Sequence, residues 1–335
     1  EFRDLTLFEN NCRELLKETL LIVLSNQKIY WKQRGKIKGV KFGDENTKFF
    51  HTKASINHRH NKIAMLMNED QVEITDHEGK AAILWEAFKK RLGQSNGHTM
   101  HFNLQNLYDN RVDPQIFIDL ERPFSQEEIE GVVKNLPTNK SPGPDGFNNE
   151  FLKACWDIIK LDVTELIIAF HAGTVNLESI NTSYITLIPK KEVPMSPNDF
   201  RPISLLNGVL KIITKLLANR LQKVILNLVH INQYGFLKNR VIQDCLGWAY
   251  EYIHQCHKSN EEMLVIKLDF EKAFDTIEHQ AIIDILRAKG FRERWITWTH
   301  MLFNSASSVV MLNGVPGKKF YCKRGVRQGD PLSPL

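Results

Sequence analysis

The sequence has few cysteines, no long apolar run and no strong excess of charge. Its five cysteines are scattered over 335 residues without a C-x-x-C pair, which indicates free thiols in a reducing compartment. His254, Cys256 and His257 lie close together but lack the spacing of a zinc site. No segment has the apolar length of a membrane span, and no signal peptide is visible. These absences predict an intracellular protein of the nucleus or cytoplasm that has no membrane partner.

The net charge of +5 is mild, but basic residues gather in residues 31–62. This stretch holds nine basic and two acidic side chains, so its net charge is +7, and the remainder of the chain is slightly acidic. Aromatic residues such as Trp31, Phe49 and Phe50 lie among the lysines. Basic side chains neutralise phosphates and aromatic rings stack on bases, so the stretch is either a solvated linker or a nucleic-acid surface. The candidate contacts are Lys32, Arg34, Lys36, Lys38, Lys41 and Lys48.

Hydrophobic spacing and turn residues place a domain boundary near residue 120. Residues 1–120 are predicted to be a helical and basic N-terminal segment, with an amphipathic helix over residues 5–32. The second part, residues 121–335, opens with Ser125-Gln-Glu-Glu128, which has the pattern of a capping box. Residues 184–190 then alternate as in a half-buried strand. Helices and strands in one segment indicate an α+β fold.

A hairpin is predicted over residues 307–322, because Asn313-Gly314 is typical of tight turns. Val315-Pro-Gly317 is expected to lengthen its loop. Residues 264–268 form a short apolar run, which predicts a strand buried on both faces that ends at Asp269. By itself, Asp269 would be read as an acceptor for the following turn. Asp275-Thr-Ile-Glu278 has the spacing of a helix N-cap, so we assign Asp275 to capping and Asp269 to chemistry.

Four motifs in this chain carry a resemblance to a known family. The run LDFEKAFD, residues 268–275, resembles the first catalytic motif of the reverse transcriptases. RGVRQGDPLSP, residues 324–334, and FRPIS, residues 200–204, resemble further motifs of the same enzymes. GDENTKFFH, residues 43–51, resembles a segment found upstream of the polymerase in plant LINE-type elements. The first three motifs, taken in the order in which they occur in the chain, resemble the reverse transcriptase of a non-LTR, LINE-type retrotransposon.

This resemblance implies the fingers and an incomplete palm of a right-hand polymerase over residues 121–335, without a thumb. The implied substrates are an RNA template, a DNA primer and deoxynucleoside triphosphates. Such polymerases use two Mg²⁺ ions roughly 4 Å apart, and Mg²⁺ takes oxygen ligands. The resemblance assigns the Asp269 carboxylate and the Phe270 backbone carbonyl as ligands.

The resemblance also implies roles for seven further residues. Lys190 and Arg201 could instead be surface charges, Lys140 part of a plain inter-helix loop, and Phe274 a packing residue at the strand end. Cations opposite the triphosphate would be Lys190 and Arg201. Phe274 would exclude a 2′-hydroxyl, and Gln328 and Gly329 would line the nucleotide pocket. Lys140, in the turn-rich Lys140-Ser-Pro-Gly-Pro-Asp-Gly146, and Arg240 would lie near the template.

The family's (F/Y)ADD motif is absent, and no Asp-Asp dipeptide occurs in the sequence. The chain begins with Glu1 and stops at Leu335 inside a motif, so we expect both ends to be cut. We therefore expect an incomplete metal site and a polypeptide that does not polymerise. One alternative is a catalytically dead remnant that at most binds nucleic acid through residues 31–62. Another is a group II intron maturase-like polymerase, which GDENTKFFH disfavours. The sequence does not indicate template specificity or oligomeric state.

Overall fold

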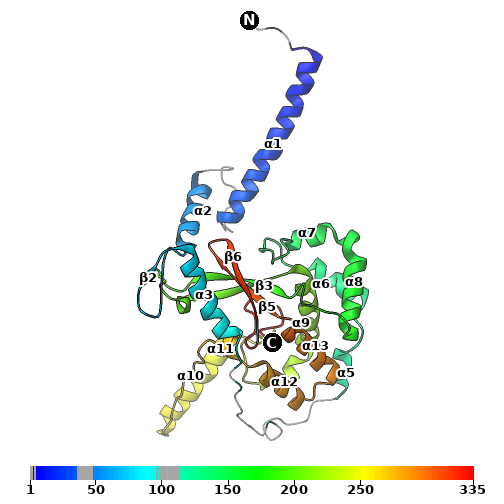
Figure 1. Ribbon diagram of the computed structural model, residues 1–335. Coiled ribbons are helices and arrows are strands. Elements are labelled where there is room, and N and C mark those ends of the chain that lie inside the picture. The colour runs from blue at the N-terminus through cyan, green and yellow to red at the C-terminus, as the bar shows by residue number, and fades with distance from the viewer. Residues whose placement is uncertain (1–2, 4, 36–47, 96, 98–103, 105–113) are drawn as a thin grey trace. The chain divides into compact units, whose positions relative to one another are not determined.

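The computed structural model describes residues 3, 5–35, 48–95, 97, 104 and 114–335 (Figure 1). The chain forms two compact units. One comprises Glu1–Ala64 with Lys191–Val193, and the other comprises Met65–Lys190 with Pro194–Leu335. The second unit therefore starts upstream of residue 120, where the sequence predicts that the polymerase-like part begins. That functional boundary stays a prediction.

The first unit is helical, as the sequence predicts. Helix α1 spans Leu7–Gly35 and helix α2 spans Lys48–Asn61. The two helices contact each other, and the rings of Trp31 and His51 lie 4.0 Å apart between their centroids.

The second unit is built on a four-stranded sheet with the order β4-β3-β5-β6. Strands β3 (Thr182–Pro189) and β4 (Phe200–Leu206) are antiparallel, and β3 runs parallel to β5 (Ser307–Leu312). Strand β6 (Val315–Tyr321) completes the predicted hairpin with β5. Leu312 pairs with Val315, so the loop is Asn313-Gly314 alone, with φ of 53° and 91°. The expected lengthening of this loop is wrong, because Val315 and Pro316 already pair with β5.

Helices surround this sheet in the mixed arrangement that the α+β prediction requires. Ser125 accepts a hydrogen bond from the Glu128 N–H at 3.2 Å, which confirms Ser125 as the N-cap of α6, while the Glu128 carboxylate accepts from Arg220 instead of completing the predicted capping box. The core surrounds α9, with Leu210 and Ile213 packed in one cluster with Trp298 of α13. The helices are α3 (His77–Leu92), α5 (Pro114–Leu120), α6 (Gln126–Lys134), α7 (Asn149–Ala154), α8 (Trp156–Ala172), α9 (Gly208–Leu228), α10 (Ile242–Ser259), α11 (Ala273–Thr276), α12 (His279–Ala288) and α13 (Glu293–Asn304). Strands β1 (Leu66–Met67) and β2 (Glu73–Ile74) form a second, small sheet, and η1 (Pro197–Asp199) is a 3₁₀ turn.

The predicted buried strand over residues 264–268 is wrong. This segment has no regular secondary structure, and Leu264 and Leu268 are 82% and 74% exposed. A strand needs a hydrogen-bonded neighbour, and one buried on both faces needs cover as well. No strand in the described part of the chain pairs with this segment.

Candidate active site

Three of the sequence motifs meet at the loop of residues 324–330. The Gly325 N–H donates to the Ile277 carbonyl at 2.7 Å, and the Val326 N–H donates to the Phe274 carbonyl at 2.6 Å. On its other side, the loop accepts a hydrogen bond at the Gln328 carbonyl from the Ser204 N–H of β4, at 2.8 Å. Backbone hydrogen bonds thus join the loop of residues 324–330, here called the QGD loop, to both the AFD turn (residues 273–275) and the RPIS strand (residues 201–204 of β4).

Two glycines permit this close approach. Gly325 has a φ of 76°, and a Cβ there would lie 2.8 Å from the Asp275 carbonyl oxygen. Gly329 has a φ of 120°, and its Cβ would lie 2.8 Å from the Ser204 carbonyl oxygen. A side chain at either position would meet backbone in a conformation that favours glycine. The predicted pocket residue Gly329 therefore lies directly against β4.

Asp275 is the last residue of the AFD turn and is buried where the turn meets this loop. Its carboxylate forms an ion pair with Arg91 at 3.6 Å, and Gln328 Nε2 donates to it at 3.3 Å. Burial raises the pKa of Asp275, although Arg91 and the Gln328 hydrogen bond act in the opposite direction. The predicted capping role is wrong, because Asp275 lies within α11 while α12 starts at His279. Its carboxylate is held by partners remote in sequence rather than by the helix start.

Arg91 is a site residue that sequence reasoning missed. It lies in the last turn of α3, and Nη2 donates to Asn198 Oδ1 of η1 at 2.7 Å. Its backbone carbonyl accepts from Arg324 Nε at 2.7 Å. No motif marks Arg91, because its partners lie more than 100 residues away in the chain.

Lys190 and Arg201 lie at the same end of the β3–β4 hairpin. Arg201 pairs with Ile188 in the ladder, and the Lys190 N–H donates to the Asp199 carbonyl at 2.8 Å. Both residues are exposed. Lys190 Nζ donates to the Asn198 carbonyl at 3.0 Å, and its charge acts to lower the pKa of Asp275 and of Glu271. The structure thus brings Lys190 toward the AFD turn, and the triphosphate contact stays a prediction.

Asp269 and Phe270 are exposed in the segment before α11. Phe274 is half-buried, and its ring lies 6.2 Å from that of Phe236, edge to face. The predicted Mg²⁺ ligands are one carboxylate and one carbonyl, fewer oxygens than Mg²⁺ takes. In the described ranges, no group of three His, Cys, Asp or Glu side chains could hold a metal. Within the described part of the chain, the residues therefore do not make a fitting site for two Mg²⁺ ions.

The predicted template contacts have different surroundings. Lys140 is exposed at the start of a loop that packs on the end of β4, where the Asp145 N–H donates to Asn207 Oδ1 at 3.1 Å. Arg240 is half-buried, and its Nη1 donates to the carbonyls of His230 and Gln233 at 2.7 and 2.6 Å. Arg240 thus fastens its own loop, and a template contact at either residue stays a prediction.

The basic stretch is described only in part. Lys36, Lys38 and Lys41 lie outside the described residues, as do the side chains of Lys32 and Lys48. Arg34 is exposed in α1, with its guanidinium carbon 3.4 Å from the centroid of the Tyr30 ring.

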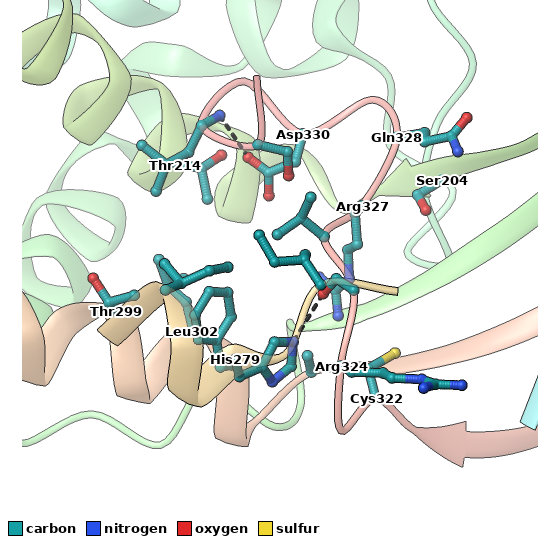
Figure 2. Close-up of a pocket in the computed structure, with 18 of the residues that line it drawn as sticks. Ser204, Thr214, His279, Thr299, Leu302, Cys322, Arg324, Arg327, Gln328 and Asp330 are labelled. Carbon is teal, nitrogen blue, oxygen red and sulfur yellow. Dashed lines mark hydrogen bonds between the residues drawn. The ribbon is translucent and has the colours of Figure 1, made fainter. Parts of the chain in front are cut away.

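A cavity of about 430 Å³ lies behind the 324–330 loop, lined mostly by apolar side chains of α9, α12 and α13 (Figure 2). Three polar side chains stabilise the loop there, two of them through hydrogen bonds that join it to other parts of the chain. Arg327 Nη2 donates to the Asn181 carbonyl at 2.8 Å, His279 Nε2 donates to the Gly325 carbonyl at 2.8 Å, and Asp330 accepts from the Leu332 N–H at 2.8 Å. Burial lowers the pKa of His279 and raises that of Asp330. None of the three was predicted as a site residue.

Residues 188–335 match the family described as "Reverse transcriptase (RNA-dependent DNA polymerase)". This part of the chain is therefore similar to that family of RNA-directed DNA polymerases. Within it, the resemblance to non-LTR, LINE-type retrotransposon enzymes is confirmed by the relatives.

The relatives are long transposon proteins. The chain is 32% identical over 215 residues to the Transposon TX1 uncharacterized 149 kDa protein of Xenopus laevis, covering 64% of this chain and 16% of that protein. It is 30% identical over 221 residues to the Retrovirus-related Pol polyprotein from type-2 retrotransposable element R2DM of Drosophila melanogaster, covering 64% and 20%. It is also 27% identical over 217 residues to the Probable RNA-directed DNA polymerase from transposon BS of the same fly, covering 64% and 24%.

The chain thus spans less than a third of the length of these curated relatives. Among the described residues, no helix is long and apolar enough to cross a membrane.

Proposed function

We propose that this chain supplies the fingers and part of the palm of an RNA-directed DNA polymerase, which extends a DNA primer on an RNA template. The observation that carries the proposal is the convergence on the 324–330 loop. The RPIS strand, the AFD turn and the QGD loop are remote in sequence but joined by backbone hydrogen bonds of 2.6–2.8 Å. Two residues remote in sequence also act on Asp275. Gln328 donates a hydrogen bond to its carboxylate, and the charge of Lys190 acts to lower its pKa.

In this proposal, Lys190 and Arg201 bind the triphosphate of the incoming nucleotide, and Gln328 and Gly329 line its pocket. An exposed hairpin end with two cations suits a phosphate chain, because charge-assisted hydrogen bonds to phosphate are strong. Phe274 packs beside the pocket and selects against a 2′-hydroxyl. Asp269 would supply one carboxylate for Mg²⁺.

We further propose that residues 1–335 alone do not polymerise. Asp269 would be the chain's single carboxylate for two ions, which normally share several hard oxygen ligands. The second function considered, nucleic-acid binding through residues 31–62, is compatible with this inactivity.

Primer extension on an RNA template with Mg²⁺ tests the proposal. Two polypeptides are compared, namely residues 1–335 and a longer form that continues through an Asp-Asp-bearing motif. Each is prepared with Asp269→Ala and with Asp284→Ala, which removes an exposed carboxylate of α12 as a control. We expect extension only in the longer form, a loss of at least about 100-fold with Asp269→Ala, and little effect of Asp284→Ala. Asp269-dependent extension by residues 1–335 would contradict the proposed inactivity, and extension that survives Asp269→Ala would contradict the assigned ligand.

A further inference from the structure

Arg91 lies upstream of the 188–335 range that matches the family, yet its guanidinium reaches the centre of the site. Its side chain is 9% exposed and that of Asp275 is 6% exposed. Arg91 Nη1 lies 3.6 Å from Asp275 Oδ2, while Nη2 donates to Asn198 Oδ1 at 2.7 Å. Arg91 therefore joins the AFD turn to the 3₁₀ turn whose Asn198 carbonyl accepts from Lys190.

The end of α3 holds Arg91 in place. The last carbonyls of a helix need partners outside it, and the Leu92 carbonyl accepts from the Lys323 and Arg324 N–H groups at 2.7 and 3.1 Å. Arg324 also donates from Nε to the Arg91 carbonyl at 2.7 Å. The guanidinium carbon of Arg91 lies 4.7 Å from the centroid of the Phe88 ring, one turn earlier. The backbone that carries Arg91 is thus fixed by the residues that open the QGD loop.

Asp275 links Arg91 to Gln328. Gln328 Nε2 donates to Asp275 Oδ1 at 3.3 Å, the other carboxylate oxygen from the one that faces Arg91. The Gln328 backbone is fixed separately by the Ser204 N–H at 2.8 Å, and Figure 2 shows Gln328 beside Ser204. The contact with Asp275 therefore sets the side-chain direction of Gln328.

We propose that Arg91 is a positioning residue of the polymerase, which orients the Gln328 amide in the nucleotide pocket through the Arg91–Asp275–Gln328 chain. This inference rests on the proposed function. According to this inference, the nucleotide pocket requires helix α3, which lies outside the family motifs. An unpaired buried carboxylate is costly, so loss of the guanidinium drives Asp275 to move or to take up a proton. Either change removes the fixed acceptor for Gln328.

The test is steady-state primer extension by the longer polypeptide, with KM for the nucleotide measured separately from kcat. We expect Arg91→Met to raise KM about tenfold, the loss of one charge-assisted contact, with a smaller change in kcat. In a Gln328→Ala background, the same substitution should leave KM unchanged, because its effect passes through Gln328. In an Asp275→Asn background, Arg91→Met should change KM less than threefold, because no buried carboxylate is then left unpaired. A threefold change is roughly the scatter expected of additive effects.

The matched control is Arg220→Met, which removes another buried arginine of an ion pair in the same unit. It should lower stability while KM stays unchanged, with all assays run at a temperature where circular dichroism shows each variant folded. An equal tenfold rise of KM in the Gln328→Ala background would overturn the positioning role.

A second measurement separates this inference from the proposed function. If no polypeptide extends a primer in an Asp269-dependent manner, the proposed function fails, and the pairing is tested by melting residues 1–335. We expect Arg91→Met to lower Tm, and Arg91→Met with Asp275→Asn to recover part of that loss. A double variant that melts no higher than Arg91→Met would overturn the pairing itself.

Discussion

At the scale of single residues, Gly325 decides whether the QGD loop can lie on the AFD turn. With a φ of 76°, a Cβ would lie 2.8 Å from both the Asp275 carbonyl oxygen and Leu92 Cδ2. We expect Gly325→Ala to destabilise the second unit by about 2 kcal/mol or more, because the left-handed backbone strain and the clash add. Urea unfolding followed by fluorescence measures this difference in the free energy of unfolding.

Gly131→Ala is the matched control for this substitution. Gly131 lies inside α6 with a negative φ, and a Cβ there would meet nothing within 4 Å. The control should therefore stabilise the protein by about 0.5–1 kcal/mol, the usual gain of alanine over glycine in a helix. If Gly325→Ala were neutral, the close contact between loop and turn would be disproved.

Residues whose role is local were predictable from the sequence. Ser125 caps α6 with a partner three residues away, and Asn313-Gly314 turns the hairpin by its own backbone preferences. Asp275 has an equally good local pattern, but Arg91 and Gln328 determine its role. A buried ion pair between residues this far apart leaves no periodic or motif signal, so neither the role of Asp275 nor Arg91 could be found.

At the scale of elements, Arg220 fastens α9 to the segment that leads into α6. Its side chain is 8% exposed and donates to both carboxylate oxygens of Glu128, at 2.9 and 2.7 Å. It also donates to the Leu120 and Pro123 carbonyls at 2.9 and 3.0 Å. We expect Arg220→Met to cost about 3–5 kcal/mol, because it leaves a carboxylate and several carbonyls without their donor. Thermal and urea unfolding check the value.

Arg122→Met provides the comparison. Arg122 pairs with Asp119 one turn earlier, and these side chains are 66% and 48% exposed. An exposed pair contributes little, so this variant should lie within about 0.5 kcal/mol of the parent. Equal costs for the two arginines would show that burial of the Arg220 pair has no energetic consequence.

The elements themselves were predicted well where one face is apolar and the other polar. Strand β3 alternates as expected, with Ile185 and Leu187 buried. Residues 264–268 show the limit of this reasoning. An apolar run predicts a buried strand, but a strand forms only where a neighbouring strand is available to pair with it. Helix α10 is similar, since none of its residues is buried even though Leu246 and Trp248 are large and apolar.

At the scale of the whole molecule, the two compact units predict which part folds alone. Residues 65–335 contain α3, which packs on β5 and β6 and buries Leu84 and Phe88 almost completely. We expect a chain of residues 65–335 to unfold in urea with the midpoint and slope of the corresponding transition in the full chain. Removal of residues 1–120 should instead destabilise the remainder by several kcal/mol, since each lost buried side chain contributes about 1.5–3 kcal/mol.

The comparison of these two truncations also tests whether the boundary predicted near residue 120 is the start of a folding unit. If residues 121–335 are as stable as residues 65–335, then α3 is an accessory and Arg91 cannot be required for a well-ordered QGD loop. If they unfold at lower urea, the folding unit that carries the QGD loop includes α3, which lies outside the range that matches the family. We expect the second result, because the last carbonyls of α3 bind Lys323 and Arg324 at the start of the loop. The site would then depend on two segments that the motifs alone do not connect.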